Sequence, residues 1–543
     1  MSEKMTGAEA IVRSLVAHDV DTLFGIPGVQ TYALFDALQR SADRIRTIHP
    51  RHEQATGYMA FGYARSTGRP GVFSVVPGPG VLNTAAAVCS AYGASAPLLC
   101  VTGQVPSNFI GSGMMHLHEL PDQLATMRSI MKWAARIQHP SEAPTIVAEA
   151  FRQMRAGRPR PVGVEMAWDL LGSVAPVAPL PPAPILSPEI DPEDIARAAS
   201  LLKDARHPMI MVGGGAQHAA AEVLDLADAL QAPVVPFRSG RGIVPDDHPL
   251  GFTCASGFRR WAETDALIGI GSRLELQWFR WPHPPRNVPL VNIDIDPAQI
   301  PRLRPAAPIV ADSRAAASAL AEAVRRLGRA RPSRHAEFEA VKARVAQDIR
   351  KIQPHEQYLR AMREVLPRDG FFVEEICQAG FTSYFGFPVY EPRTFVSCGP
   401  QGTLGFGYPT ALGVKVANPT KPVLSISGDG GFMFGVQELA TAVQHRINVV
   451  AVVFNNGAFG NVLRDQEQRF GGRVIGAELR NPDFMKLAES FGMAGCRATS
   501  PGALRTALER AFAADAPALI EVPVDRHTEV SPWEFLMPAP TPP

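Results

Sequence analysis

The sequence predicts an α/β protein built from three doubly wound parallel-sheet domains. Short β-branched runs alternate with helical patterns along the chain, which is typical of βαβ units and parallel sheets. The alternation recurs in three blocks of similar size, and its strand-like runs commonly end in loops that contain Gly or Pro. A length of 543 residues fits about three or four domains at ~100–200 residues each.

Each block contributes its own set of expected strands, recognised as short apolar runs followed by turn residues. In chain order they lie at 21–25, 71–76 and 97–103 in the first block, at 208–215, 232–237, 266–272 and 289–296 in the second, and at 394–399, 422–431, 448–456 and 518–524 in the third. Helical patterns separate them, so we expect parallel strands joined by helical crossovers.

Two segments separate the blocks and predict the domain boundaries. Residues 172–189 are rich in proline, which sustains neither a helix nor a central strand. Residues 331–355 read as a basic, Ala-rich linker helix. We therefore expect an N-terminal domain over 1–171, a central domain over 190–330, and a C-terminal domain with its tail over 356–543.

Charge and composition exclude several classes of protein. With 53 basic and 52 acidic residues the formal net charge is +1, which gives no electrostatic reason to expect a nucleic-acid or anionic-membrane partner. The six cysteines are scattered along the chain, which argues against a zinc ribbon or a disulfide framework. The start of the chain lacks the apolar run of a secretory signal, and the most apolar stretch, 85–101, is too short and interrupted to span a bilayer. We expect a cytoplasmic protein.

The most informative stretch places Asp429 after one expected strand and Asn456, 27 residues later, after the next. A right-handed βαβ crossover brings the carboxyl ends of two parallel strands together. One carboxylate, one amide oxygen and a main-chain carbonyl leave room for phosphate oxygens, which is how proteins usually hold Mg²⁺. The neighbouring glycines, Gly430 and Gly431, let backbone N–H groups approach a phosphate. The alternative is that both segments are only turns that end strands.

The Gly-Asp-Gly and Asn-Asn spacing resembles the diphosphate motif of thiamine diphosphate enzymes. The whole chain resembles the acetolactate synthase/2-oxo acid decarboxylase branch of that family, with a pyrimidine-binding N-terminal domain, a central domain and a diphosphate-binding C-terminal domain. The resemblance implies three Mg²⁺ ligands, Asp429, Asn456 and the carbonyl of Ala458. Gly431 departs from the synthases, which often carry Ser there. The further cofactor-binding positions implied are Pro27, Glu53, Asn83, Gly402, Thr403, Leu404, Gly430, Gly431 and Phe459.

Glu53 lies in a segment, R-H-E-Q followed by A-x-G-Y-A-R, that is similar to the family's stretch around its catalytic glutamate. The resemblance implies that its carboxyl group shares a proton with the aminopyrimidine ring of the cofactor. The alternative is that Glu53 only stabilises the first turn of a helix through the helix dipole. The stretch around Gly402 is also similar to the family's, which implies a carbonyl acceptor at Gly402 and an apolar wedge under the cofactor at Leu404.

Two further candidates concern the substrate. Gln30 falls near the position where the benzaldehyde lyase branch has a functional His, and His118 falls at a Gln position of the synthases, so we take both as catalytic candidates. A surface-loop role is the alternative for His118. Asp465 lies where true synthases carry a Trp that shapes the second-substrate pocket. This departure weakens the likeness to true synthases, and the segments around His118 and Trp533 look more like 2-oxo acid decarboxylases such as the guanidino-oxopentanoate enzymes.

These resemblances imply a thiamine diphosphate- and Mg²⁺-dependent enzyme that decarboxylates a 2-oxo acid, ligates it to an aldehyde or ketone acceptor as a 2-hydroxyketone, or does both. An FAD-containing oxidase of the pyruvate oxidase type and a catalytically silent scaffold stay open as alternatives. The glycine turn at 211–216 is weak evidence for a dinucleotide, so FAD stays open as the less favoured alternative. The family also implies a homodimer or homotetramer with active sites at the subunit interface, in keeping with a charged fraction of only 19%.

Overall fold

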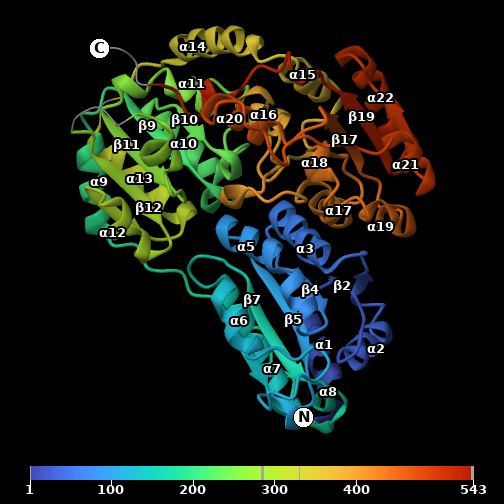
Figure 1. The fold of residues 1–543 in the computed structure, drawn as a ribbon. Coiled ribbons are helices and arrows are strands. Elements are labelled where there is room, and N and C mark those ends of the chain that lie inside the picture. The colour runs from blue at the N-terminus through green and yellow to red at the C-terminus, as the bar shows by residue number, and fades with distance from the viewer. Residues whose placement is uncertain (1, 283–286, 329, 540–543) are drawn as a thin grey trace.

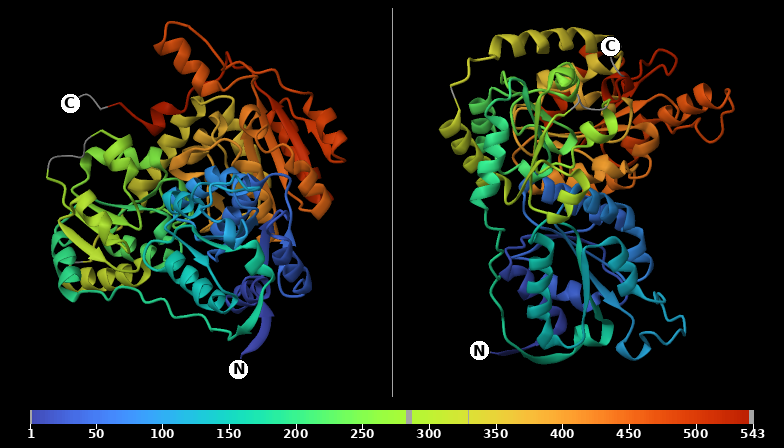
Figure 2. Two further views of the ribbon diagram at one scale, coloured as in Figure 1. Left: turned by 60° about the horizontal axis from the view of Figure 1, so that its bottom comes forward. Right: turned by 90° about the vertical axis from the view of Figure 1, so that its left-hand side faces the viewer.

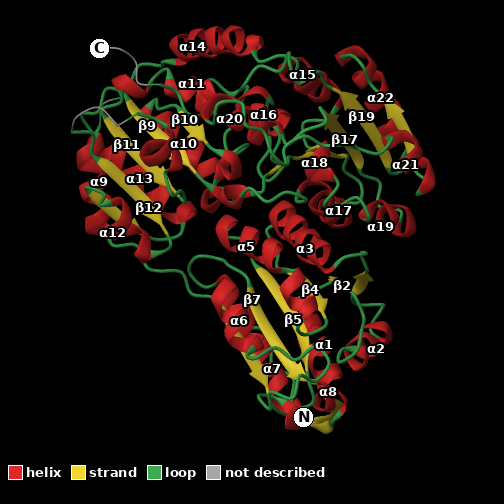
Figure 3. Cartoon of the chain, in the orientation of Figure 1, coloured by secondary structure: helices red, strands yellow, loops and turns green. Residues whose placement is uncertain are grey.

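The computed structural model describes residues 2–282, 287–328 and 330–539, and it contains three parallel β-sheets flanked by helices (Figure 1 and Figure 3). The predicted fold class is therefore confirmed. Within the described residues, every helix is too short or too polar to cross a lipid bilayer.

The N-terminal sheet has six strands in the order β3-β2-β4-β5-β7-β6, and all neighbouring strands are parallel. Its strands are β2 (Thr22–Gly25), β3 (Arg46–Ile48), β4 (Gly71–Val75), β5 (Leu98–Gln104), β6 (Trp133–Ile137) and β7 (Val162–Ala167). Its helices are α1 (Gly7–Ala17), α2 (Tyr32–Arg40), α3 (Glu53–Thr67), α4 (Pro79–Asn83), α5 (Ala85–Ala94), α6 (Gln123–Ile130), α7 (Ala143–Arg155) and α8 (Trp168–Gly172).

The central sheet has five parallel strands in the order β10-β9-β11-β12-β13. The strands are β9 (Pro208–Val212), β10 (Val234–Pro236), β11 (Ala266–Ile270), β12 (Leu290–Asp294) and β13 (Ala307–Val310). The helices are α9 (Pro192–Leu202), α10 (Ala220–Leu230), α11 (Cys254–Phe258), α12 (Ile300–Leu303) and α13 (Ser313–Leu327).

The C-terminal sheet has six parallel strands in the order β15-β14-β16-β17-β19-β18. The strands are β14 (Phe371–Val373), β15 (Phe395–Val396), β16 (Val423–Gly428), β17 (Val450–Asn455), β18 (Ala494–Arg497) and β19 (Ala518–Pro523). The helices are α15 (His355–Val365), α16 (Gln378–Gly386), α17 (Gly407–Ala417), α18 (Asp429–Phe432), α19 (Glu438–His445), α20 (Gly460–Arg469), α21 (Phe484–Ser490), α22 (Pro501–Ala514) and α23 (Trp533–Leu536).

Each strand expected from the sequence overlaps a strand of the structure, whereas six strands of the three parallel sheets were not expected. The missed strands are β3, β6, β7, β13, β14 and β18. Four of them lie at sheet edges, where a strand needs fewer apolar residues; every residue of β18, for example, is exposed. β14 is a central strand, but it is only three residues long and leads directly into two glutamates.

The two predicted linkers differ in their structure. The start of residues 172–189 forms β8 (Val174–Val177), which pairs antiparallel with β1 (Glu3–Thr6), so this part is not a free extended connector. The chain then runs without helix or strand to α9, as an extended trace along the outside of the molecule (Figure 2). The second linker contains α14 (His335–Asp348). The domain boundaries themselves stay predictions.

The N-terminal and C-terminal domains share one apolar core, formed where α3 packs against α17. Phe406 lies between Tyr58 and Phe61, with ring centroids 5.5 and 5.1 Å away in edge-to-face geometry. The helix backbones approach so closely that a Cβ added at Gly413 would overlap the main chain of Met59, and one at Gly62 would overlap the carbonyl of Thr410. The sequence thus joins the first and third domains through a pair of helices.

Candidate active site

The structure brings the carboxyl ends of β16 and β17 together, as the sequence predicts. The two strands are parallel neighbours with Gly428 opposite Phe454, so Asp429 and the Asn455-Asn456 pair leave the sheet at the same edge. Nδ2 of Asn481 donates to Oδ2 of Asp429 at 2.6 Å and to Oδ1 of Asn455 at 2.9 Å. A single amide group therefore bridges the two strand ends.

Asp429 is a buried acid at the end of β16, and a nearby positive charge would stabilise its ionised form. Its exposed fraction is 1%. Burial raises the pKa of Asp429, and the hydrogen bond from Asn481 opposes that shift only in part. A divalent cation at this carboxylate would offset the cost of burying its charge, and Mg²⁺ prefers oxygen ligands of this kind. The buried acid therefore fits the expected metal.

The Asn456 side chain is held by a buried, hydrogen-bonded pair of side chains, Glu529 and His355, that was not expected from the sequence. Its Nδ2 donates to Oε2 of Glu529 at 2.8 Å, and Oε1 of Glu529 lies 2.9 Å from Nε2 of His355. The side chains of His355 and Glu529 are 1% and 4% exposed. Because the amide nitrogen faces Glu529, the Oδ1 atom faces the other way, where it accepts a hydrogen bond from the Ala458 amide at 3.1 Å. The oxygen is thus turned toward the strand end that carries Ala458.

Two glycines and Phe459 complete this half of the site. A Cβ added at Gly430 would overlap the Phe459 ring, and one added at Gly431 would overlap Oε1 of Glu375. The main chain of Phe459 is fixed by a 2.8 Å hydrogen bond from its amide to the carbonyl of Ala477. Glycine is therefore required at both positions, and a diphosphate that approached this turn would meet backbone N–H groups rather than side chains. In the part of the chain that the structure describes, no three His, Cys, Asp or Glu residues cluster as a metal site, so a cation here depends on amide and main-chain oxygens.

The predicted Gly402–Leu404 segment lies beside the N-terminal domain. Gly402 has φ +59, in the left-handed region that favours glycine. Thr403 Oγ1 is 2.9 Å from Oγ of Ser90 on α5, and Leu404 is half-buried. The segment is thus held from both sides, by its own backbone conformation and by a contact between domains.

Glu53 and Asn83 form the other predicted half of the site. Glu53 begins α3, and Nδ1 of His52 caps that helix by accepting from the Gln54 amide at 3.1 Å. Oε2 of Glu53 accepts a hydrogen bond from Nδ2 of Asn83 at 3.0 Å. The turn before Glu53 is held from the C-terminal domain, since the fully buried carboxylate of Glu438 accepts from the His52 amide at 3.1 Å. Two predicted cofactor residues thus share a hydrogen bond.

The structure also joins the two predicted substrate residues. Nε2 of Gln30 donates to the Leu117 carbonyl at 2.8 Å, and Oε1 of Gln30 lies 2.7 Å from Nδ1 of His118. Since a carbonyl only accepts, the Gln30 oxygen must face His118, and Nδ1 of His118 must carry the proton. Burial lowers the pKa of His118. A neutral His118 therefore keeps an unprotonated Nε2. Pro27 lies exposed in the same loop as Gln30.

Comparisons with known proteins identify the three domains. Residues 5–126, 195–320 and 376–522 match the N-terminal TPP binding domain, the central domain and the C-terminal TPP binding domain of thiamine pyrophosphate (diphosphate) enzymes. The chain belongs to the thiamine pyrophosphate enzyme family. It is thus an enzyme that depends on thiamine diphosphate, and its three parallel sheets lie in the three matched regions.

Full-length relatives of this family member carry two kinds of name. A probable 2-ketoarginine decarboxylase of Pseudomonas aeruginosa is 34% identical, over 95% of this chain and 94% of that protein. A probable acetolactate synthase large subunit of Methanocaldococcus jannaschii is 33% identical, over 96% and 92%. The acetolactate synthase isozyme 1 large subunit of Escherichia coli K12 is 30% identical, over 98% and 96%.

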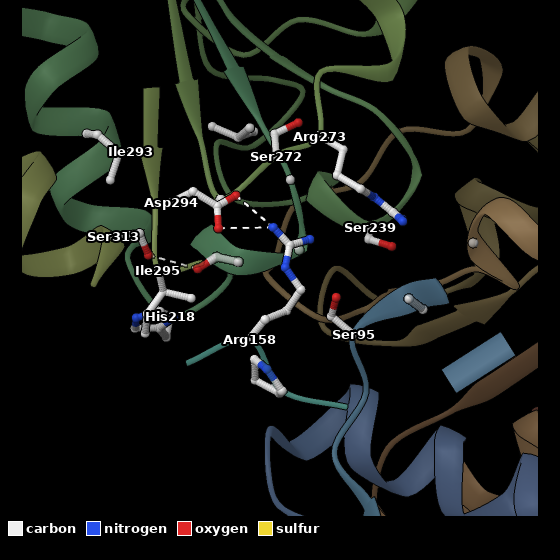
Figure 4. A pocket seen from close by; sticks show the side chains of 18 of the residues that line it. Ser95, Arg158, His218, Ser239, Ser272, Arg273, Ile293, Asp294, Ile295 and Ser313 are labelled. Carbon is white, nitrogen blue, oxygen red and sulfur yellow. Dashed lines mark hydrogen bonds and ion pairs between the residues drawn. The ribbon is translucent and has the colours of Figure 1, made fainter. Parts of the chain in front are cut away.

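This thiamine diphosphate enzyme has a cavity of about 450 Å³ where its three domains meet, partly lined by Gly213, Gly214 and Gly215 after β9. Figure 4 shows Arg158 reaching both carboxylate oxygens of Asp294, each at 3.0 Å. Glycine backbone and guanidinium groups fit the phosphates of any nucleotide. The cavity therefore carries no argument for FAD in particular.

Proposed function

We propose that the protein decarboxylates a 2-oxo acid without oxidation, using thiamine diphosphate and Mg²⁺. One observation carries the metal part of this proposal: the buried Asp429 and the Asn455-Asn456 pair leave the same sheet edge, bridged by Asn481. Asp429, the Asn456 side-chain oxygen and the Ala458 carbonyl would hold the cation. The glycine turn would receive the diphosphate. When bound, thiamine diphosphate supplies the carbon nucleophile that attacks the substrate carbonyl.

Glu53 is the proposed acid on the pyrimidine side. Its carboxyl group would hold a proton at a ring nitrogen of the cofactor, and the 3.0 Å hydrogen bond from Asn83 would fix the direction in which the carboxyl group points. Because Glu53 begins a helix that packs firmly on α17, its backbone has little freedom to shift. Gly402 and Leu404 would support the cofactor from the C-terminal domain.

His118 is the proposed proton carrier on the substrate side. Gln30 fixes its tautomer, so that Nε2 can accept the hydroxyl proton released as the product carbonyl re-forms and pass it to solvent, while the reaction as a whole takes up one proton from solvent. The relatives are named for 2-ketoarginine decarboxylation and for acetolactate synthesis, both of which involve a 2-oxo acid. Asp465 occupies the position at which the synthases carry a Trp that shapes the second-substrate pocket. This departure favours decarboxylation, and ligation to an aldehyde or ketone acceptor is the second candidate.

The proposal also includes an assembly and a location. We propose a homodimer, or a dimer of dimers, in which the Glu53 half of one subunit faces the Asp429 half of another. Size-exclusion chromatography with light scattering tests it, and an active monomer would contradict it. Function without FAD is tested by the absorption spectrum of the purified protein, since a flavin would show a visible band. The cytoplasmic location stays a prediction.

A product screen tests the activity. The protein with thiamine diphosphate and Mg²⁺ is given a panel of 2-oxo acids, each with and without an acceptor aldehyde, and CO₂, aldehyde and 2-hydroxyketone are measured. Release of CO₂ and aldehyde in equal amounts without acceptor supports decarboxylation. A product that forms only with the acceptor supports ligation. CO₂ release that requires oxygen would instead support an oxidase, and no release from any 2-oxo acid would contradict the proposal.

A further inference from the structure

A pair of adjacent glutamates, Glu374 and Glu375, lies fully buried at the end of β14. Burying two carboxyl groups is costly unless each has partners. Oε1 of Glu374 accepts a hydrogen bond from the Tyr384 hydroxyl at 3.2 Å. Its other oxygen, Oε2, has no hydrogen-bond partner among the described residues. Glu375 has both oxygens engaged. The two neighbours therefore differ in how closely they are tied to the rest of the domain.

Glu375 joins two segments that the proposed function assigns to the cofactor. Its Oε1 accepts from the amide of Gly405, and its Oε2 accepts from the amide of Gly407 at 3.3 Å. These amides directly follow the Gly402–Leu404 segment. Oε2 also accepts from the hydroxyl of Ser427 at 2.6 Å, two residues before Asp429. One carboxyl group thus connects the pyrimidine-side segment with the strand that leads into the diphosphate turn.

The Glu375 side chain also occupies space beside that turn. A Cβ added at Gly431 would overlap Oε1 and would lie only 2.9 Å from the carboxyl carbon of Glu375. Distances below 3.0 Å are closer than real Cβ contacts, so one of the two groups would have to move. Gly431 is the position at which the sequence departs from the synthases, which often carry Ser. The space for that side chain is filled here by Glu375.

We propose that Glu375 is a positioning residue that sets the distance between the Gly402–Gly407 segment and the Gly428–Gly431 turn, and that Gly431 is required because of it. This inference rests on the proposed function, since the two segments matter only if they hold thiamine diphosphate. All three groups that face Glu375 donate hydrogen bonds, so an acceptor-only carboxylate suits the position. A Gln would direct an amide group, itself a donor, at one of them.

The first test measures thiamine diphosphate affinity at saturating Mg²⁺ for the unmodified protein, Glu375→Gln and the matched control Glu374→Gln. Both variants neutralise a fully buried carboxyl group, but only Glu375 touches the cofactor segments. We expect the dissociation constant to rise at least tenfold for Glu375→Gln and less than threefold for Glu374→Gln. Equal effects of the two variants would overturn the proposal, because they would show a general cost of altering this buried pair.

The second test uses the predicted overlap and does not depend on Glu375→Gln folding well. Gly431→Ser alone should weaken cofactor binding at least tenfold. Glu375→Asp withdraws the carboxyl group by about one bond length, ~1.5 Å, and makes room for the Ser side chain. We therefore expect the double variant to bind more tightly than Gly431→Ser, so that the two changes are not additive. Additive losses, or tight binding by Gly431→Ser alone, would overturn the proposal.

The unmodified protein separates this inference from the function on which it rests. If it does not bind thiamine diphosphate in the presence of Mg²⁺, the proposed function fails and the role of Glu375 fails with it. The other case is that it binds the cofactor and releases CO₂ from a 2-oxo acid, while the effects of Glu375→Asp and Gly431→Ser on cofactor affinity are additive. In that case only the role of Glu375 fails.

Discussion

Replacing Glu529 by Gln tests whether Asn456 is oriented for a metal. The carboxylate accepts from Asn456 at 2.8 Å and from His355 at 2.9 Å, and its side chain is only 4% exposed. A Gln has one side-chain oxygen, so it can accept from one of these groups, and its amide nitrogen must face the other. The change removes the carboxylate charge and so weakens the hydrogen bond to Asn456, since bonds to charged groups are worth about 1.5–3 kcal/mol and neutral ones about 0.5–1.5 kcal/mol; Nε2 of His355 can accept from the new amide group in its other tautomer.

Part of that energy should appear as lost metal affinity. Residues that orient a metal ligand typically change metal affinity by about 10–100-fold when mutated. We expect the Mg²⁺ dissociation constant, measured by titration calorimetry with thiamine diphosphate present, to rise about tenfold, which corresponds to about 1.4 kcal/mol. Glu53 and His118 are untouched, so turnover at saturating Mg²⁺ and cofactor should stay within about threefold of the unmodified protein, well below one power of ten.

Glu521 offers a matched control for this experiment. Its side chain is 5% exposed, its Oε1 accepts from Nδ2 of Asn455, the residue before Asn456, at the same distance of 2.8 Å, and its Oε2 accepts from Nε of Arg497 at 2.8 Å. Glu521→Gln should lower thermal stability as Glu529→Gln does, but change the Mg²⁺ dissociation constant by less than threefold. If Glu529→Gln leaves Mg²⁺ affinity unchanged, or if both variants weaken it equally, Glu529 does not act by orienting Asn456.

Three further predictions follow from the same geometry. Glu53→Gln should abolish exchange of the cofactor C2 proton for deuterium, measured by NMR, with little change in cofactor affinity; an unchanged exchange rate would refute the proton role. Asp429→Ala should weaken cofactor binding and make it insensitive to added Mg²⁺, so a binding curve that still responds to metal would contradict the ligand assignment. Burial lowers the pKa of His118 below its ordinary value of 6.5, so the neutral form dominates at pH 7. Activity should therefore fall only as the pH drops below 6.5, and His118→Asn should remove that acid limb from the pH profile of kcat.

Sequence reasoning proposed the candidate site residues that follow strands and did not propose those that arrive from far along the chain. Asp429 and Asn456 could be predicted because turn chemistry at two consecutive strand ends is a local signal. Glu529 lies 73 residues beyond Asn456, in a stretch without a helix or strand, and no local pattern marks its contact. Glu375 is 30 residues from Gly405 and follows a three-residue strand that was itself not expected.

The substrate side shows the same division. Gln30 and His118 were identified separately by their positions in loops, and their hydrogen bond across 88 residues depends on how β2 and the loop after β5 fold together. The fold itself was largely predictable, since alternating strand and helix patterns are local, whereas edge strands such as β18 carry little apolar signal. Hydrogen bonds between distant segments are a property of packing and leave no mark in the spacing of residues.

The close packing of α3 on α17 has a consequence for how the enzyme admits its substrate. Because main chain meets main chain at Gly62 and Gly413, a rotation of these two domains within one subunit would break the apolar core that they share. Hinge bending between them is therefore costly, and smaller parts are the expected regulators of access. The surface loop that bears Met114 and Met115, which are 75% and 79% exposed, runs directly into His118 and is the natural place for such a gate.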